Sequence, residues 1–233
     1  ALVKEMFEAG LHWGRSRSST HPKMKPYIFS SRGDVQVIDL AKTVEALKKV
    51  EEFMREIARK GGNVMLVGTQ PAAKKLVQEM AERFNYPYVH ERWLGGTLTN
   101  FKTFLSRLDH MNALQKKIES EEFEHYTKRE RTKFLQEYKE LEKKFQGIRL
   151  LSALPDALVL LGVNKHETAL REAKRRGIPI IAVANTDDDP SEADWVIPAN
   201  GNATTAIKFI LGRLGDAIEK ARHELIEKIA END

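Results

Sequence analysis

Three short apolar runs constrain the fold of this chain more than any other feature of its sequence. They are Val64–Val67, Ala157–Leu161 and Ile178–Val183, and each lies between residues that break regular structure. A strand that is apolar along its whole length, without polar residues at alternate positions, is typical of parallel sheets, where both faces are covered. Further strand candidates lie at 35–38, 88–89 and 195–197.

Helical patterns separate these runs. Apolar residues from Val44 to Ile57 recur at helical spacing. Further helices are expected over about 70–84, 165–176 and 203–229. Gly61-Gly62 and Gly177 stand where helices end. The alternation of strand and helix predicts an α/β fold with a doubly wound, mostly parallel sheet and helices on both of its faces.

One segment, residues 102–146, interrupts the alternation because it contains no strand pattern. Two apolar stripes at helical spacing are separated by polar residues around 120–127. This pattern predicts an inserted α-helical coiled-coil hairpin. The expected organisation is an α/β globular domain of residues 1–101 and 147–233 and a hairpin of residues 102–146. Charges of both signs favour a solvated helix surface over a basic contact face that includes Lys128 and Arg131.

The chain of 233 residues is only mildly basic, with 38 Lys and Arg against 34 Asp and Glu. Such an excess indicates nucleic acid only where it is clustered. It is clustered between Glu8 and Asp34, where no acidic residue occurs and where two prolines and several hydroxyls lie. We expect a basic phosphate-binding loop over residues 10–33. Its candidate contact residues are Arg15, Arg17, Ser18, His21, Lys23, Lys25 and Arg32.

A second candidate is the block from His90 to Lys102, which follows a short strand and leads into the helical segment. Gly95-Gly96 permits positive φ and close backbone approach, and a helix start behind it offers free N–H groups to anions. The alternative is a tight strand-to-helix turn in which Trp93 fills the core. The candidate contact residues are Arg92, Trp93, Thr97, Asn100 and Lys102.

Other motifs are weaker. Gly68-Thr69 follows a strand but has no glycine fingerprint around it, so turn chemistry explains it better than a nucleotide site. Asp187-Asp188-Asp189 could hold Mg²⁺, yet three such residues before Pro190 are also ordinary loop material. The chain has no cysteine, which excludes thiolate metal sites. The histidines are scattered; His166, for example, is expected as a surface cap, and no catalytic set is expected.

The sequence resembles the ribosomal protein S-two family in blocks that run in family order from about Gly10 to Arg213. The most specific block is Arg92–Thr103. Others are 21–28, 37–43, 67–69, 154–157, 177–179 and 197–200. Arg15, Asn185 and Gly201-Asn202 replace a His and Asp residues that are common in the family, and these departures argue against a metal site.

The resemblance implies a structural constituent of the small ribosomal subunit, of bacterial or organellar type, in a cytoplasmic or organellar ribosome. It implies binding to small-subunit rRNA between head and body, support of assembly and translation, and contact with neighbouring ribosomal proteins, including the large S-one protein in many bacteria. It implies no enzymatic activity, no membrane, no small-molecule substrate and no cofactor beyond diffuse or RNA-bridging Mg²⁺.

Two other classes of function compete with this one. An enzyme or sensor would bind a nucleotide or phosphosugar at the carboxyl edge of the sheet, near Gly68, Gly162 and Thr186, but the sequence has neither a glycine fingerprint nor an acid/base pair there. A scaffold held by its coiled coil alone would need a long heptad seam, whereas these stripes are short.

Overall fold

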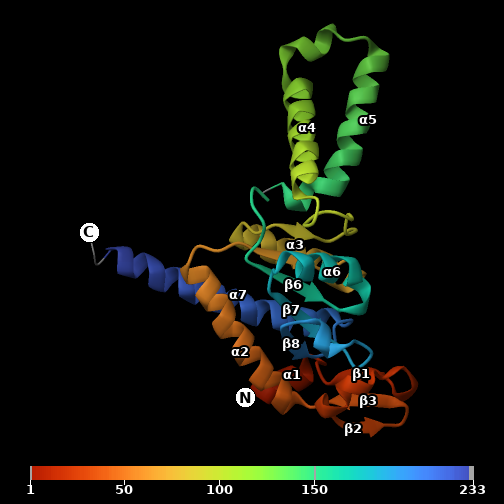
Figure 1. Cartoon of the computed structure of the whole chain (residues 1–233), viewed down its shortest axis with the longest axis vertical. Helices are drawn as coiled ribbons and strands as arrows, with labels where there is room; N and C mark the ends of the chain where they lie inside the picture. The colour runs from red at the N-terminus through yellow and green to blue at the C-terminus, as the bar shows by residue number, and fades with distance from the viewer. Residues whose placement is uncertain (1, 150, 231–233) are drawn as a thin grey trace.

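The computed structural model describes residues 2–149 and 151–230 and is centred on a five-stranded parallel sheet (Figure 1). The strand order is β5-β4-β6-β7-β8. The strands are β4 (Val64–Val67), β5 (Tyr88–Val89), β6 (Ala157–Leu161), β7 (Ile180–Ala184) and β8 (Trp195–Pro198). The chain leaves β4 toward β5 and returns to β6 on the other side of β4, so the order reverses between β4 and β6. The predicted doubly wound sheet is confirmed.

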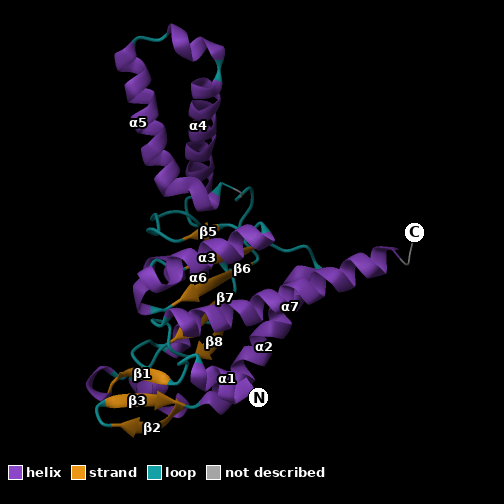
Figure 2. Cartoon of the chain, turned by 180° about the vertical axis from the view of Figure 1, so that it is seen from behind, coloured by secondary structure: helices purple, strands orange, loops and turns teal. Residues whose placement is uncertain are grey.

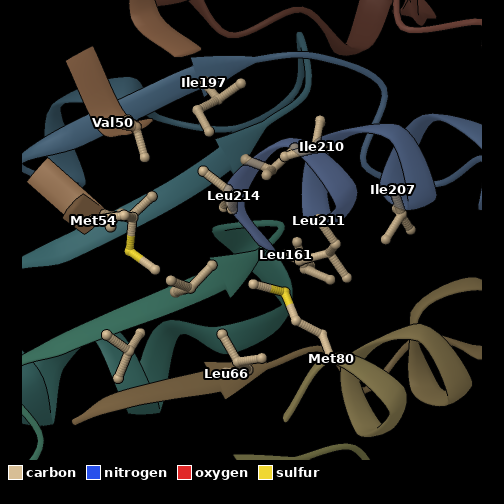
Figure 3. Packing of buried hydrophobic residues seen from close by; sticks show 14 of the residues in the cluster. Val50, Met54, Leu66, Met80, Leu161, Ile197, Ile207, Ile210, Leu211 and Leu214 are labelled. Atoms are coloured by element: carbon tan, nitrogen blue, oxygen red, sulfur yellow. The ribbon is translucent and has the colours of Figure 1, made fainter. Parts of the chain in front are cut away.

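Helices cover both faces of the sheet because successive strand residues point in opposite directions. In β4, Leu66 joins the core beneath α2, α3 and α7, whereas Met65 joins the core on the other face with α6. Figure 3 shows Val50 and Met54 of α2 packed near Leu214 of α7 and Leu161 of β6. The bounds are α1 (Leu2–Glu8), α2 (Leu40–Arg59), α3 (Pro71–Phe84), α6 (Glu167–Arg176) and α7 (Thr204–Ala230).

The inserted hairpin, called the arm below, extends away from the sheet beyond β5 (Figure 2). It consists of α4 (Phe101–Glu119), the 3-10 helix η3 (Glu121–His125) and α5 (Lys128–Phe145). A capping box between Thr127 and Glu130 starts α5. At the tip, the Lys117 ammonium lies 4.4 Å from the Tyr126 ring centre and 4.1 Å from that of Phe134. The arm thus closes its own tip by local contacts.

The N-terminal region forms a second, antiparallel sheet of order β1-β3-β2 at the end opposite the arm. Its strands are β1 (Trp13–Ser16), β2 (Ile28–Arg32) and β3 (Val35–Ile38), with 3-10 helices η1 (Arg17–Ser19) and η2 (Pro22–Tyr27) between β1 and β2. The expected basic loop over 10–33 is therefore mostly ordered backbone. Because β1 and β2 bury few side chains, they lack the apolar pattern by which strands are predicted. We call this sheet with η1 and η2 the N-terminal sheet.

Three further 3-10 helices complete the described chain: η4 (Gln146–Ile148), η5 (Asn164–His166) and η6 (Pro190–Glu192). No described helix combines the length and the apolar character required to cross a membrane.

Candidate nucleic-acid interface

The N-terminal sheet is joined to the parallel sheet at the loop that follows β7. Thr186, fully buried in this loop, accepts a hydrogen bond from the Arg15 N–H at its Oγ1 (2.7 Å) and one from the His21 N–H at its carbonyl (2.8 Å). Gly14 makes this approach possible, because a Cβ there would lie 2.6 Å from Thr186 Cγ2. β1 is thus held against the carboxyl edge of the parallel sheet.

Two of the expected phosphate ligands face carboxylates in the same loop. Lys23 Nζ lies 2.8 Å from Asp189 Oδ2, and Arg15 Nε lies 3.5 Å from Asp187 Oδ2. Hydrogen bonds from Lys23 and Ser191 hold the pKa of Asp189 well below its usual range. His21 lies beside the same pair, with Nε2 3.8 Å from Asp189. These three basic side chains fasten the N-terminal sheet to the acidic loop.

The remaining cations of the N-terminal sheet, Arg17, Lys25 and Arg32, are exposed. None of them has a carboxylate within ion-pair distance in the described part of the chain. Ser18 is also exposed, and its hydroxyl lies 3.1 Å from that of Ser16. This is the set of N-terminal candidates that remains free to meet an anionic partner.

The carboxylates of the acidic loop are turned to separate protein partners. Buried Asp188 accepts the N–H groups of Asn164 (2.8 Å) and Asn185 (2.9 Å), and burial raises its pKa. Asp189 accepts the Ser191 N–H and Lys23, as above. Among the described residues, no three His, Asp or Glu side chains converge as metal ligands.

In the second candidate block, Trp93 and Thr97 lie inside the protein and cannot meet RNA as expected. Trp93 is 9% exposed and donates its indole N–H to Glu172, while Thr97 is 1% exposed and donates its hydroxyl to the carbonyl of Leu94. The alternative interpretation, a tight turn with Trp93 in the core, describes these two residues. Arg92, Asn100 and Lys102 are exposed around the turn.

Arg92 borders a hollow of about 330 Å³ at the carboxyl edge of the sheet, together with Thr69, Lys165 and Thr168. Lys165 also borders a second, much smaller hollow that Arg15 lines, so it connects the Arg92 side of this edge to the N-terminal sheet. Sequence reasoning missed Lys165. Its position just after β6, on the edge where doubly wound sheets bind ligands, is the signal that could have found it.

His166 was expected as a surface cap, but only 2% of it is exposed. Its Nδ1 lies 2.7 Å from the Gly162 carbonyl, so that nitrogen carries the proton, and its Nε2 accepts the Thr69 N–H at 3.3 Å. Burial lowers the pKa of His166, which keeps the ring neutral. The residue locks the turn after β4 to the turn after β6. The turn at Gly68-Thr69 is thus built by protein contacts.

The two arm candidates differ in their surroundings. Arg131 Nη1 lies 2.7 Å from Glu124 at the arm's tip, whereas Lys128, at the start of α5, is exposed and has no ion-pair partner in the described chain. Acidic residues are interspersed along both helices. The arm surface is therefore mixed in charge.

Comparison with known proteins assigns the family. The family model described as Ribosomal protein S2 matches residues 6–221. The chain belongs to the ribosomal protein S2 family. It is 41% identical over 225 residues to the small ribosomal subunit protein uS2 of Thermus thermophilus in each of two strains, covering 97% of this chain and 88% of the relative. The uS2 protein of Bdellovibrio bacteriovorus is 41% identical over 215 residues, covering 92% of this chain and 69% of the relative.

Membership in the S2 family makes this chain a structural ribosomal protein and not an enzyme, as the sequence predicted. The relatives are bacterial, in agreement with the bacterial type of the sequence motifs. The buried Trp93 and Thr97 lie within the most specific resemblance block. Part of that block therefore builds a turn. The exposed cations that flank this turn, Arg92 and Lys102, are the residues of the block that could contact a partner.

Proposed function

We propose that this chain is a structural constituent of the small ribosomal subunit that binds small-subunit rRNA between head and body and supports assembly and translation. The observation that carries the proposal, beyond family membership, is a set of three exposed cations in the N-terminal sheet. Arg17, Lys25 and Arg32 are exposed, and none has a carboxylate partner among the described residues. Cations that have no protein partner are the ones available to neutralise phosphates and release counterions.

A second contact surface continues along the carboxyl edge of the parallel sheet through Lys165 and Arg92 to Lys102 at the start of the arm. Asn100 adds an exposed amide beside them. The hollow bordered by Arg92 and Lys165 has room for a backbone phosphate with its sugar. Lys128 extends the same chemistry to the arm. Mg²⁺ takes part, in this proposal, only as diffuse or RNA-bridging ions.

The proposed protein partners are neighbouring small-subunit proteins, among them the S-one protein where it exists. Support comes from a largely apolar groove of about 620 Å³ between the N-terminal sheet, α1 and the start of α2, bordered by Phe7, Trp13 and Phe29 and also by Arg32. Phe29 is 75% exposed and Phe7 is 59% exposed. Exposed aromatic side chains gathered in one groove fit a protein surface better than a phosphate backbone. Phe29→Ala removes no charge, so it should weaken binding of the S-one protein and leave the salt slope of rRNA binding unchanged.

The experiment measures the affinity for small-subunit rRNA as a function of salt. Replacing Arg17, Lys25 and Arg32 by Ala should flatten the slope of log affinity against log salt by about 2 to 3, since each neutralised phosphate contributes about −0.7 to −0.9. Replacing Arg15 and Lys23 instead should act mainly by detaching the N-terminal sheet from the acidic loop.

A matched control replaces Lys48, Lys49 and Lys208, exposed cations of α2 and α7, by Ala. Both triple variants lower the formal net charge from +4 to +1. Equal flattening in both would mean that net charge alone attracts RNA and would contradict the proposed interface. Stabilisation of the chain by a free nucleotide or phosphosugar, with no rRNA binding, would instead support the competing small-molecule function.

A further inference from the structure

A single buried carboxylate organises the turn from which the arm begins. Glu172, on α6, is 6% exposed and lies far from this turn in sequence. Its Oε1 accepts the Trp93 indole N–H (3.0 Å) and the Gly96 N–H (2.8 Å). Its Oε2 accepts the N–H groups of Leu98 (3.0 Å) and Thr99 (3.1 Å) and the Thr99 hydroxyl (3.2 Å). Both oxygens are thus engaged by the turn.

No cation balances this carboxylate: in the described part of the chain, no Lys, Arg or His nitrogen lies within 4.0 Å of Glu172. Three backbone N–H groups and two side-chain donors take that place. Burial would raise the pKa of Glu172, but these hydrogen bonds outweigh burial and hold the pKa below its usual range. Hydrogen bonds to an ionised acceptor are about twice as strong as neutral ones, so the turn is held by strong contacts.

The geometry of this turn determines where two exposed cations lie and where helix α4 begins. Arg92 directly precedes Trp93, and α4 starts at Phe101 with Lys102 in its first turn. Asn100, at the start of α4, makes no side-chain capping bond. Gly96 adopts a φ of +89°, a conformation that glycine reaches readily and that other residues rarely adopt. Glu172, on a neighbouring helix, accepts the N–H of this glycine and so ties the turn to α6.

We propose that Glu172 is a positioning residue that fixes the direction of the arm and the placement of Arg92 and Lys102. The proposed effect on the direction of the arm rests on the contacts above. The proposed effect on RNA binding rests on the proposed function. Glu172 touches no RNA itself. It acts through the backbone of Gly96, Leu98 and Thr99, whose N–H groups it draws to one point.

The first experiment measures the direction of the arm without RNA. The chain has no cysteine, so Lys75→Cys on α3 and Lys133→Cys on α5 can be spin-labelled specifically, and both positions are exposed. The label-to-label distance distribution should be narrow in the otherwise unchanged chain and should broaden in Glu172→Gln, because an amide NH₂ would face backbone donors. Glu167→Gln, an exposed carboxylate of the same helix, should leave it narrow.

The second experiment repeats the salt-dependent rRNA binding with Glu172→Gln. The slope should flatten by about 1 to 2, as expected when Arg92 and Lys102 lose their phosphates. A narrow distance distribution and an unchanged slope in Glu172→Gln would overturn the inference. If the unaltered chain fails to bind rRNA, the proposed function fails, and the distance distribution still decides whether Glu172 positions the arm.

Milder changes keep the test decisive if Glu172→Gln does not fold. Trp93→Phe keeps a buried ring and removes one donor, and Thr99→Val removes another, so each should broaden the distribution less than the Gln variant would.

A pH series separates positioning by the Glu172 charge from simple packing of its side chain. Because the folded pKa lies below the ordinary 4.5, the distribution should stay narrow at neutral pH and broaden in acid; a distribution that ignores both acid and the two mild variants would overturn the inference.

Discussion

The N-terminal sheet and the arm lie at opposite ends of the parallel sheet, beside β8 and β5 respectively (Figure 1). At the loop after β7, the N-terminal sheet meets the parallel sheet through Thr186, Asp187 and Asp189, by hydrogen bonds and ion pairs. The root of the arm meets it through apolar side chains. Those of Phe104, Phe145, Met111 and Ile148 are all at most 6% exposed and belong to one core.

This difference teaches that the two appendages should respond to different conditions. Apolar burial depends little on salt and on protonation, whereas exposed ion pairs are screened by salt and lost when the carboxylate is protonated. Glu172 is a polar contact at the start of the arm and therefore an exception there. It orders the turn before α4 but takes no part in the apolar packing at the root. We therefore expect high salt to loosen the N-terminal sheet and to leave the apolar root of the arm unchanged, whereas acid should act on both appendages, at Asp189 and at Glu172.

The largest expected effect is at the root of the arm. Phe145→Ala would remove a buried ring whose centre lies 5.2 Å from that of Phe104. Such truncations cost about 3–5 kcal/mol, since transfer and cavity terms add. Urea unfolding followed by circular dichroism measures the loss. Leu135→Ala, on the exposed side of the same helix (39% exposed), should change stability by no more than about 0.5 kcal/mol. Equal losses in the two variants would mean that apolar burial does not stabilise the root of the arm.

An intermediate effect is expected where β1 meets Thr186. In Gly14→Ala the new Cβ would lie 2.6 Å from Thr186 Cγ2 and 2.9 Å from the Gln36 carbonyl, so β1 must move. Overpacking of this kind costs about 1–3 kcal/mol. Hydrogen exchange should increase at Arg15 and His21, whose N–H groups bond to Thr186, and remain unchanged in the arm. Gly212→Ala, which meets nothing within 4 Å, serves as the control, and increased exchange in the arm would contradict the separation.

The parallel sheet, its helices and the arm were predictable because each has a long periodic or fully apolar pattern. Ala157–Leu161 is strand β6 over its whole length, and the helix expected over 203–229 is α7 to within one residue at each end. In the N-terminal sheet, β3 was predicted with its observed bounds, whereas β1 and β2 were not predicted. β2 exposes four of its five residues, so period-two burial, the property that distinguishes a strand in a sequence, is missing there.

The candidate site was predicted in composition but not in geometry. The acid-free stretch indicated a set of candidate cations, yet the carboxylates that engage Arg15 and Lys23 lie more than 160 positions later in the sequence. Trp93 and Glu172 are also far apart, 79 positions. Local sequence patterns carry no information on such pairs, because only the packed sheet brings the loop after β7 and helix α6 to these residues.

The smallest expected effect is at the ion pair of Lys23 and Asp189. Because the folded pKa of Asp189 lies below the ordinary 3.8, the pair stabilises the docked N-terminal sheet at neutral pH, and this contribution is lost as the pH falls below that value. Asp189→Asn should reduce the acid dependence and cost about 1 kcal/mol or less, since partly exposed pairs contribute little.

Hydrogen exchange at Arg15 and His21, followed against pH and against salt, measures the effect of this pair. High salt should increase exchange in the unaltered chain and should do so less in Asp189→Asn, which keeps the Arg15–Asp187 pair but loses the Lys23–Asp189 pair. The control is Glu192→Gln, because Glu192 lies on the same loop but pairs with Lys174. Asp194→Asn is not a suitable control, because Asp194 accepts the Ile180 N–H within the sheet. If high salt loosened the arm root as readily as the N-terminal sheet, the two appendages would share one kind of attachment, and the contrast between them would be wrong.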